Sequence, residues 1–314
     1  MSATAIGVDV GGTKVNALRL TPEGEVVARV TLPTPEDAEA PVEVLVEAAR
    51  AVLNEDVVVA GVGAAGLLEV STGVMRFAPN IAWREAPILD RVRDALGVPT
   101  LVDNDCTAAG FGEWRLGAGR GHDDVVYVGV GTGIGGALVM GGRLQRGARG
   151  FAGEIGHIIV EPDGPACGCG NRGCWEVVAS GHAIMRDGRG ALRRHAHSAI
   201  AEMADGNPER VTGTLVTDAA RSGDATARGI LAEVGHRLGQ GIAGLVNVLD
   251  PSIVIVGGGV AEAGELVLAP ARAAYLACVE GRELRSDVSI VPAALGPDGA
   301  AVGAAVLALE ELVP

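Results

Sequence analysis

The apolar positions of the chain fall into two patterns. Short runs of Val, Ile, Leu and Ala, bounded by glycine, proline or charged residues, predict buried strands. They lie at residues 4–10, 15–20, 25–31, 57–62, 100–102, 125–130, 137–140, 252–256 and 288–292. Apolar residues spaced three and four positions apart predict helices over residues 36–54, 88–96, 106–116, 225–249 and 300–312. Strands and helices that alternate in this way indicate an α/β protein.

The order of the predicted elements repeats along the chain. The sequence opens with a strand, a glycine-rich turn, a strand, a second turn and a third strand. The first glycine turn is Gly11–Lys14. The same order returns at residue 125, and Gly131–Gly136 is the second glycine turn. The glycine-rich stretch 117–121 lies between the two copies. We therefore predict an internal duplication, with two halves of one architecture.

Each glycine turn follows a buried strand, and a third glycine cluster, Gly257–Gly259, does the same. Phosphate oxygens need several N–H donors at once, and glycine lets the backbone approach them without a Cβ. Thr13 and Thr132 add hydroxyl donors, and Lys14 adds a charge. A strand follows the first turn, which excludes a Walker loop because that loop leads into a helix. The pattern favours a bound nucleotide; the alternatives are ordinary turns and a solvated lysine.

Two acidic residues stand at predicted strand ends. Asp9 precedes the first glycine turn, where a carboxylate would repel phosphate unless a cation such as Mg²⁺ lay between them. Asp105 follows Asn104, and a carboxylate there can take the proton of a phosphoryl-acceptor hydroxyl. The alternatives are a turn acid for Asp9 and a helix N-cap for Asp105. The residues alone leave both questions open.

The segment from Glu154 to Glu176 holds the densest chemistry in the chain. It contains the four residues that a closed zinc site needs, namely His157, Cys167, Cys169 and Cys174. Glu154, His157 and Glu176 are also suited to hold a polyhydroxylated ligand. The alternatives for the cysteines are a disulfide or inert thiols, and we favour zinc. The isolated Cys106 and Cys278 are expected to be small buried hydrophobes.

Composition narrows the class of protein. The 314 residues fit two ordinary domains. A net charge of −14 argues against nucleic acid or an anionic membrane as a partner. No basic region precedes the first strand, and the longest apolar run, 299–309, is too short to span a bilayer. We expect a cytoplasmic protein.

Six motifs occur together and in order: DVGGTK (9–14), DND (103–105), GTGIGG (131–136), GEIGH (153–157), CGCGNRGCWE (167–176) and VGGGV (256–260). In this set the chain resembles the ROK family of sugar kinases and repressors, within the actin-like ATPase superfamily. More narrowly, it is similar to the zinc-containing bacterial glucokinases of that family. The resemblance covers residues 9 to about 303. The loop 63–66 lacks a proline frequent in the family, and Cys106-Thr107 replaces the usual small residues, which puts only sugar preference in doubt.

The resemblance implies an α/β chain with the actin-like ATPase (ribonuclease H-like) fold and a cleft between two α/β domains. The small domain would span residues 1–117, with a C-terminal helix of about 299–314 packed back on it. The large domain would span 118–298 and carry the zinc site. The family also implies a homodimer or homotetramer.

The resemblance further implies a role for individual residues. Asp105 would be the catalytic base, and the sugar would contact Gly66, Asn104, Asp105, Glu154, His157 and Glu176. ATP and Mg²⁺ would be bound by Asp9, Gly11, Gly12, Thr13, Lys14, Thr132, Gly133, Gly258 and Gly259. A structural Zn²⁺ would be held by His157, Cys167, Cys169 and Cys174. The implied reaction is transfer of the γ-phosphate of ATP to the 6-hydroxyl of glucose.

Other interpretations of the sequence differ in the substrate or in the class of protein. Another hexose, such as N-acetylmannosamine, N-acetylglucosamine, fructose or allose, would use the same hydroxyl contacts, and polyphosphate is an alternative donor. A repressor needs a DNA-binding module, for which we expect no room before the first strand at residue 4. A non-catalytic sugar sensor could lose the base or the phosphate turns, and both are present.

Overall fold

The computed structural model describes residues 3–35, 40–78, 83–194 and 197–313. The chain forms two compact units. Unit 1 comprises residues 1–127, 136–153 and 294–314, and unit 2 comprises 128–135 and 154–293. The chain therefore passes between the units within two of its strands, again after residue 153 and again after residue 293. The predicted domain division at residue 117 stays a prediction.

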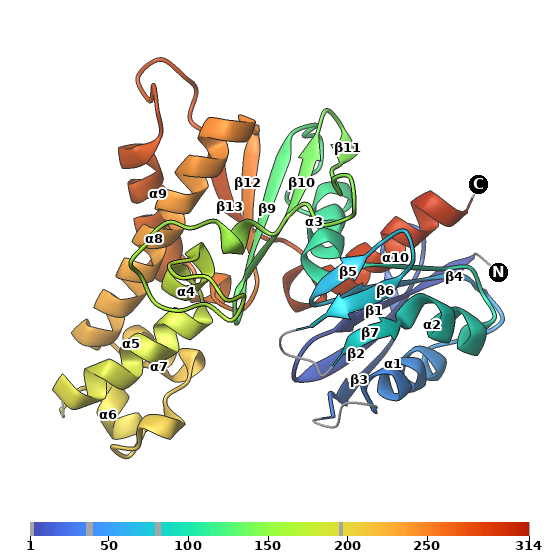
Figure 1. The fold of residues 1–314 in the computed structure, drawn as a ribbon, viewed down its shortest axis with the longest axis horizontal. Helices are drawn as coiled ribbons and strands as arrows, with labels where there is room; N and C mark the ends of the chain where they lie inside the picture. The colour runs from blue at the N-terminus through green and yellow to red at the C-terminus, as the bar shows by residue number, and fades with distance from the viewer. Residues whose placement is uncertain (1–2, 36–39, 79–82, 195–196, 314) are drawn as a thin grey trace. The chain divides into compact units, whose positions relative to one another are not determined.

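Unit 1 is built on a five-stranded sheet of order β3-β2-β1-β4-β8 (Figure 1). The strands are β1 (Thr4–Val10), β2 (Lys14–Leu20), β3 (Val26–Pro33), β4 (Val57–Ala64) and β8 (Thr100–Asn104). The first three are antiparallel neighbours, and β4 and β8 continue the sheet parallel to β1. The helices are α1 (Ala40–Ala51), α2 (Ile88–Leu96), α3 (Asp105–Arg115) and α10 (Gly299–Leu312). Residues 36–39 of the predicted first helix lie outside the described residues.

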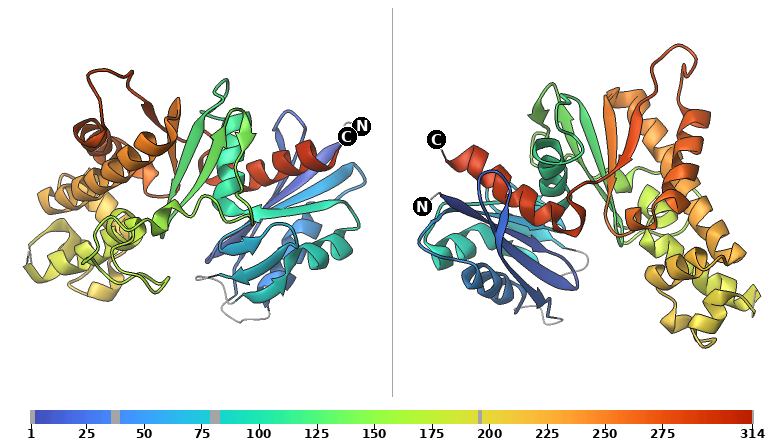
Figure 2. Two further views of the ribbon diagram at one scale, coloured as in Figure 1. Left: turned by 45° about the horizontal axis from the view of Figure 1, so that its top comes forward. Right: turned by 180° about the vertical axis from the view of Figure 1, so that it is seen from behind.

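The C-terminal helix α10 packs directly on the sheet of unit 1 (Figure 2). A Cβ at Gly7 of β1 would overlap the backbone of Ala301, and one at Gly61 of β4 would overlap that of Ala304. Gly303 of α10 meets the backbone of Ala108 on α3 in the same way. These glycines let helix and sheet approach at backbone distance, which explains why an Ala- and Gly-rich helix is buried here.

The second sheet has five strands in the order β11-β10-β9-β12-β13. They are β9 (Val125–Val130), β10 (Ile134–Met140), β11 (Arg143–Leu144), β12 (Ile253–Gly257) and β13 (Ser289–Pro292). This order matches β3-β2-β1-β4-β8 strand for strand, so the predicted duplication is confirmed. The helices of unit 2 are α4 (Trp175–Ala179), α5 (Gly181–Arg194), α6 (Ala199–Met203), α7 (Gly213–Arg221), α8 (Ala225–Leu249) and α9 (Glu265–Cys278). Asp224 caps α8 by accepting from Ala227 N at 2.7 Å, as predicted.

The hydrophobic pattern did not reveal a small antiparallel sheet in unit 1. It consists of β5 (Leu67–Glu69), β6 (Val74–Phe77) and β7 (Arg84–Pro87). These strands are short and half-exposed, so they carry no apolar run. Among the described residues, no helix is both long enough and apolar enough to cross a membrane.

Candidate active site and metal centre

In unit 1, three predicted site segments meet at the ends of parallel strands. Asp9 on β1 pairs in register with Gly63 on β4, and Gly63 pairs with Asp103 on β8. A Cβ at Gly63 would lie 3.3 Å from the Cα of Asp105, so this glycine lets α3 begin close to the sheet. The carboxyl ends of parallel strands are where α/β folds bind ligands. The sheet therefore brings together Asp9, the loop that begins at Gly63, and the strand end that leads to Asp105.

Asn104, and not Asp105, is the N-cap of α3. Its Oδ1 accepts from the backbone N–H groups of Cys106 (2.9 Å) and Thr107 (3.1 Å). Its Nδ2 donates to the carbonyl of Gly66 at 3.3 Å, which links it to the predicted sugar loop. The alternative role of Asp105 as the helix cap is therefore wrong. Asp105 is the first residue of the helix, and its carboxylate is left outside the cap.

The acids of unit 1 have perturbed ionisation. Burial and, to a lesser extent, the charge of Asp105 together raise the pKa of Asp9 to about 7, while Lys14 acts in the opposite direction. Burial also raises the pKa of Asp105, while hydrogen bonds from the backbone N–H groups of Cys106 and of Asp105 itself lower it. Both carboxylates resist ionisation because they lie in a poorly solvated place. Such groups suit proton transfer or cation binding.

A supporting ion pair lies behind Asn104 and Asp105. Asp103 is buried, and its Oδ2 accepts from Arg146 Nε at 2.6 Å, while its Oδ1 accepts from Asn104 N at 2.8 Å. Arg146 also pairs with Glu311 of α10 at 2.8 Å. The pair thus fixes the strand end that delivers the predicted base. Sequence reasoning missed Arg146, because a lone arginine far along the chain carries no signal.

The first glycine turn is a short hairpin connection between β1 and β2. Gly11 N donates to Lys14 O at 3.0 Å, and Thr34 Oγ1 donates to Gly11 O at 2.7 Å. Gly12, Thr13 and Lys14 are exposed. The turn therefore presents its backbone and hydroxyl donors to a ligand, as a phosphate site requires.

The second glycine turn and the third glycine cluster lie side by side in unit 2. Val130 O, just before the turn, accepts from Val260 N at 3.0 Å. Gly258 has φ 82°, and a Cβ there would lie 2.5 Å from that same oxygen, so only glycine fits. Thr132 and Gly259 are exposed. The structure thus brings together the predicted nucleotide residues of this unit.

The four predicted metal ligands also come together. The ligand atoms of His157, Cys167, Cys169 and Cys174 all lie within 4.8 Å of one another. Cys169 Sγ is 3.7 Å from Cys174 Sγ, and Cys167 Sγ is 3.8 Å from His157 Nδ1. Sulfur ligands of one tetrahedral zinc lie about 3.8 Å apart, so the donor set and its spacing fit Zn²⁺. We call these four residues the cysteine cluster.

Burial raises the pKa of the Cys167 and Cys174 thiols. Their deprotonation is therefore favoured chiefly by a bound cation. All five cysteines are free of disulfides, so the disulfide alternative is wrong. Cys278 is exposed, which corrects its expected burial; it lies at the end of α9, whose last turn faces solvent.

His157 offers a different nitrogen to each of its predicted roles. Nδ1 faces Cys167, and Nε2 lies 3.8 Å from Glu154 Oε2. Glu176 Oε1 lies 3.6 Å from Nδ1 and 3.0 Å from Cys167 Sγ. One ring can thus serve as a metal ligand on one side and contact a further ligand on the other.

Local packing holds the cluster segment in place. Gly173 has φ 65°, and a Cβ there would overlap the backbone of Glu161, so the tight loop requires glycine. Trp175, fully buried between Cys174 and Glu176, donates from Nε1 to Arg237 O on α8 at 3.0 Å. Trp175 thus anchors both neighbours to the longest helix. Sequence analysis did not assign it a role, although its place in the CWE motif was a signal.

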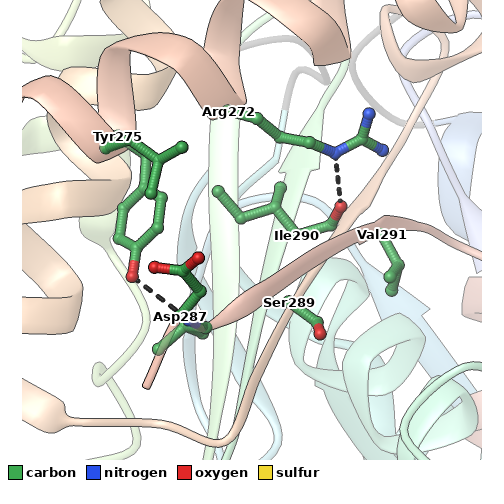
Figure 3. Close-up of a pocket in the computed structure, with 8 residues that line it drawn as sticks. Arg272, Tyr275, Asp287, Ser289, Ile290 and Val291 are labelled. Atoms are coloured by element: carbon green, nitrogen blue, oxygen red, sulfur yellow. Dashed lines mark hydrogen bonds between the residues drawn. The ribbon is translucent and has the colours of Figure 1, made fainter. Parts of the chain in front are cut away.

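A pocket of about 310 Å³ lies elsewhere in unit 2, between α9 and the edge strand β13 (Figure 3). Arg272 Nε donates to Ile290 O at 2.9 Å, and Val288 N donates to the Tyr275 hydroxyl at 3.2 Å. None of its lining residues is a predicted site residue. Its arginine is already bound to the strand and to Glu265, so the motif residues remain the candidate site.

Comparisons with known proteins agree with this geometry. The ROK family model matches residues 5–311. The glucokinase of Streptomyces coelicolor is 40% identical over 311 residues, covering 97% of both chains. That of Thermotoga maritima is 38% identical over 272 residues, covering 85% of both. The crystal structure of a ROK family glucokinase from Streptomyces griseus in complex with glucose and AMPPNP matches with TM-score 0.92 and 41% identity, covering 98% of this chain and 100% of that one.

The duplicated sheets and this structural match define the class as the actin-like ATPase fold, which confirms the predicted fold. Within that class, the chain belongs to the ROK family.

Proposed function

We propose that this chain is a glucokinase, which transfers the γ-phosphate of ATP to the 6-hydroxyl of glucose. The observation that carries the proposal is the match over 98% of the chain to the S. griseus glucokinase, whose crystals hold glucose and AMPPNP. The geometry supports it, because both units present the residue types that a sugar and a nucleotide need.

On the acceptor side, we assign Asp105 as the general base. Asn104 caps α3, so the Asp105 carboxylate is not needed for the helix. Burial raises its pKa, which brings it closer to the range where a base works at neutral pH. Asp105 takes the proton of the 6-hydroxyl as that oxygen attacks the γ-phosphorus in line and ADP leaves. Glucose hydroxyls contact Gly66, Asn104, Glu154, His157 and Glu176 in this assignment.

On the donor side, the backbone N–H groups of the glycine turns stabilise the phosphate charge. Gly11, Gly12, Thr13 and Lys14 act in the first turn, Thr132 and Gly133 in the second, and Gly258 and Gly259 beside the adenosine. Asp9, which ends β1 beside the first turn, orients the Mg²⁺ that accompanies ATP. Its raised pKa is expected to fall when a divalent cation lies near it.

We propose that the cysteine cluster holds a structural Zn²⁺. A closed set of four protein ligands supplies folding stability and leaves no position for a substrate. His157, Glu154 and Glu176 then stand on a fixed frame. The spacing of the sulfur and nitrogen atoms supports this assignment.

The test is a coupled ADP-release assay with MgATP against glucose, N-acetylmannosamine, N-acetylglucosamine, fructose and water, with polyphosphate as a second donor. We expect turnover with glucose well above the rest. Faster turnover with an N-acetyl sugar would keep the kinase and change its substrate. If folded, zinc-replete protein released no ADP with any sugar, the proposal that the chain is a sugar kinase would be refuted. Light scattering on the same sample would test the proposed homodimer or homotetramer.

A further inference from the structure

We propose that Glu176 is a positioning residue that couples the cysteine cluster to the second glycine turn, so that a filled cluster strengthens nucleotide binding even without sugar. This inference rests on the proposed function, which places a nucleotide phosphate at that turn. It gives Glu176 a role beyond contact with sugar.

The two oxygens of Glu176 face different partners. Oε1 accepts from the Cys167 thiol at 3.0 Å and lies 3.6 Å from His157 Nδ1; a cation bound by these two atoms would displace the thiol proton, so this hydrogen bond belongs to the metal-free cluster. Oε2 lies 3.4 Å from Ile134 N, at the end of the second glycine turn. A Cβ on Gly133 would overlap Oε2. The carboxylate therefore rests on the backbone of the turn, and it can do so because residue 133 is glycine.

The segments that carry the cluster also grip the turn through their backbones. Gly156, next to His157, packs so closely that a Cβ would overlap Ile134 O. Gly181, at the start of α5, donates from its N–H to Gly131 O at 2.9 Å. The turn is thus held by elements on both sides of the cysteines. Glu176 is the side chain that joins these supports to the metal ligands themselves.

The energetic consequence follows from preorganisation. A bound metal would deprotonate Cys167, which leaves the N–H of Ile134 as the partner of the Glu176 carboxylate, and it would fix Cys174, the N-cap of the helix that carries Glu176. A fixed Glu176 holds the turn in one conformation, so less conformational entropy is lost when phosphate binds. Without the metal, the turn must be ordered when the nucleotide binds, and this entropy cost lowers the nucleotide affinity. Because coupling is reciprocal, the nucleotide must also strengthen metal retention.

The experiment is a double-mutant cycle on MgAMPPNP binding, measured by calorimetry without sugar. The proteins are the wild type, Cys169→Ser, Glu176→Ala and the double variant, with zinc content measured for each. Cys169 is chosen because it is exposed and lies beside Cys174. We expect each single variant to bind MgAMPPNP about 10-fold more weakly, and the double variant to bind no more weakly than the weaker single variant.

Two controls separate positioning from general damage. Glu176→Gln keeps the shape and an oxygen acceptor, so it should retain most of the nucleotide affinity. Glu161→Ala removes a carboxylate of the same segment that pairs with Arg237 at 3.7 Å, and its nucleotide affinity should stay within about twofold of the wild type. Chelation and re-addition of zinc to folded wild type and Glu176→Ala repeats the cycle without a cysteine variant; only the wild type should respond.

Losses that multiply in the double variant, or zinc-free wild type with unchanged MgAMPPNP affinity, would overturn the coupling. Failure of the proposed function looks different, because the wild type itself would neither bind MgAMPPNP nor release ADP with any sugar.

Discussion

The two glycine turns occupy equivalent places in two sheets of the same strand order, yet their surroundings differ. The first is a nearly free hairpin, held from outside by Thr34. The second is held by α5, by the segment around Gly156 and by Glu176. The residues before the turns differ too, since Asp9-Val10 ends β1 and Gly129-Val130 ends β9.

The two copies share their strand order and their glycine turn, and they differ in the segments inserted between the strands. Both copies keep a backbone that can hold phosphate. The chain between β11 and β12 adds a cysteine cluster and a set of helices to the second copy. The first copy has buried and half-buried acids at its strand ends and no such cluster of metal ligands among its described residues. We therefore expect proton and Mg²⁺ chemistry in unit 1 and structural metal support in unit 2.

The largest expected effect tests the chemistry of unit 1. Asp105→Asn keeps the size of the side chain and the Asn104 cap but removes the base. We expect kcat to fall by about 10²-fold or more, with glucose affinity by calorimetry retained. A kcat near that of the wild type would remove Asp105 from the mechanism and would leave unit 1 without its distinguishing role.

A second prediction concerns Glu113, a buried carboxylate on α3 that lies outside both glycine turns. It accepts from Ala118 N (2.9 Å), Ala294 N (3.0 Å) and Leu295 N (2.7 Å). The last two donors lie where the chain re-enters unit 1. Glu113→Ala leaves three part-buried N–H donors without this acceptor, so we expect a loss of about 3 kcal/mol in the free energy of unfolding.

Urea unfolding measures that loss, and Glu310→Ala is the matched control. Glu310 pairs with Arg115 at 2.5 Å but is exposed, so its removal should cost below about 1 kcal/mol. Equal losses in the two variants would show that the Glu113 contacts do not hold the re-entering chain.

The residues that sequence alone revealed are those with a local signature. The strand 4–10, the helices 88–96 and 225–249, and the glycine and cysteine motifs follow from spacing that neighbours along the chain impose. The duplication followed from the repeated order of elements. The four candidate metal ligands were predicted because the cysteines are close in sequence, and the structure brings their ligand atoms together.

What sequence did not reveal depends on contacts between distant segments. Arg146 reaches Asp103 across 43 positions, and Glu113 meets Leu295 across 182. The identity of the α3 cap could not be read either, because Asn104 and Asp105 are equally good capping residues and only the backbone angles decide between them. The half-exposed strands β5 to β7 carried no hydrophobic pattern that exceeds chance.

A third prediction sharpens the contrast between Asp9 and its equivalent, Gly129. The folded protein holds the Asp9 proton up to about pH 7, whereas in the unfolded chain the carboxyl has its ordinary pKa of 3.8 and releases the proton at lower pH. The cost of ionising Asp9 therefore grows as pH rises from about 4 to 7 and is complete above 7. Asp9→Asn removes this cost, of the order of 2–4 kcal/mol, and should raise the melting temperature at pH 8.

The same variant should lose turnover, since Asn is a poorer Mg²⁺ ligand than a carboxylate. The stability gap between Asp9→Asn and the wild type should narrow as pH falls from 7 towards 4 in thermal melts without Mg²⁺. A gap independent of pH would mean that Asp9 does not titrate in this range, and that the first turn is no more acidic in character than the second.

The smallest effect compares two glycines of the second turn. A methyl group at Gly133 would overlap Glu176 Oε2, whereas one at Gly131 meets nothing within 4 Å. Glu176 can swing away, so Gly133→Ala should fold normally but displace the carboxylate from Ile134 N. Because the coupling between turn and cluster is reciprocal, a turn that no longer holds this carboxylate should also retain the metal less well. In chelator competition, we therefore expect Gly133→Ala to bind zinc several-fold more weakly than the wild type and Gly131→Ala to match it. Equal zinc affinities in all three proteins would mean that the second turn rests on the cluster segment without influencing its metal, and the contrast between the two turns would then be one of packing alone.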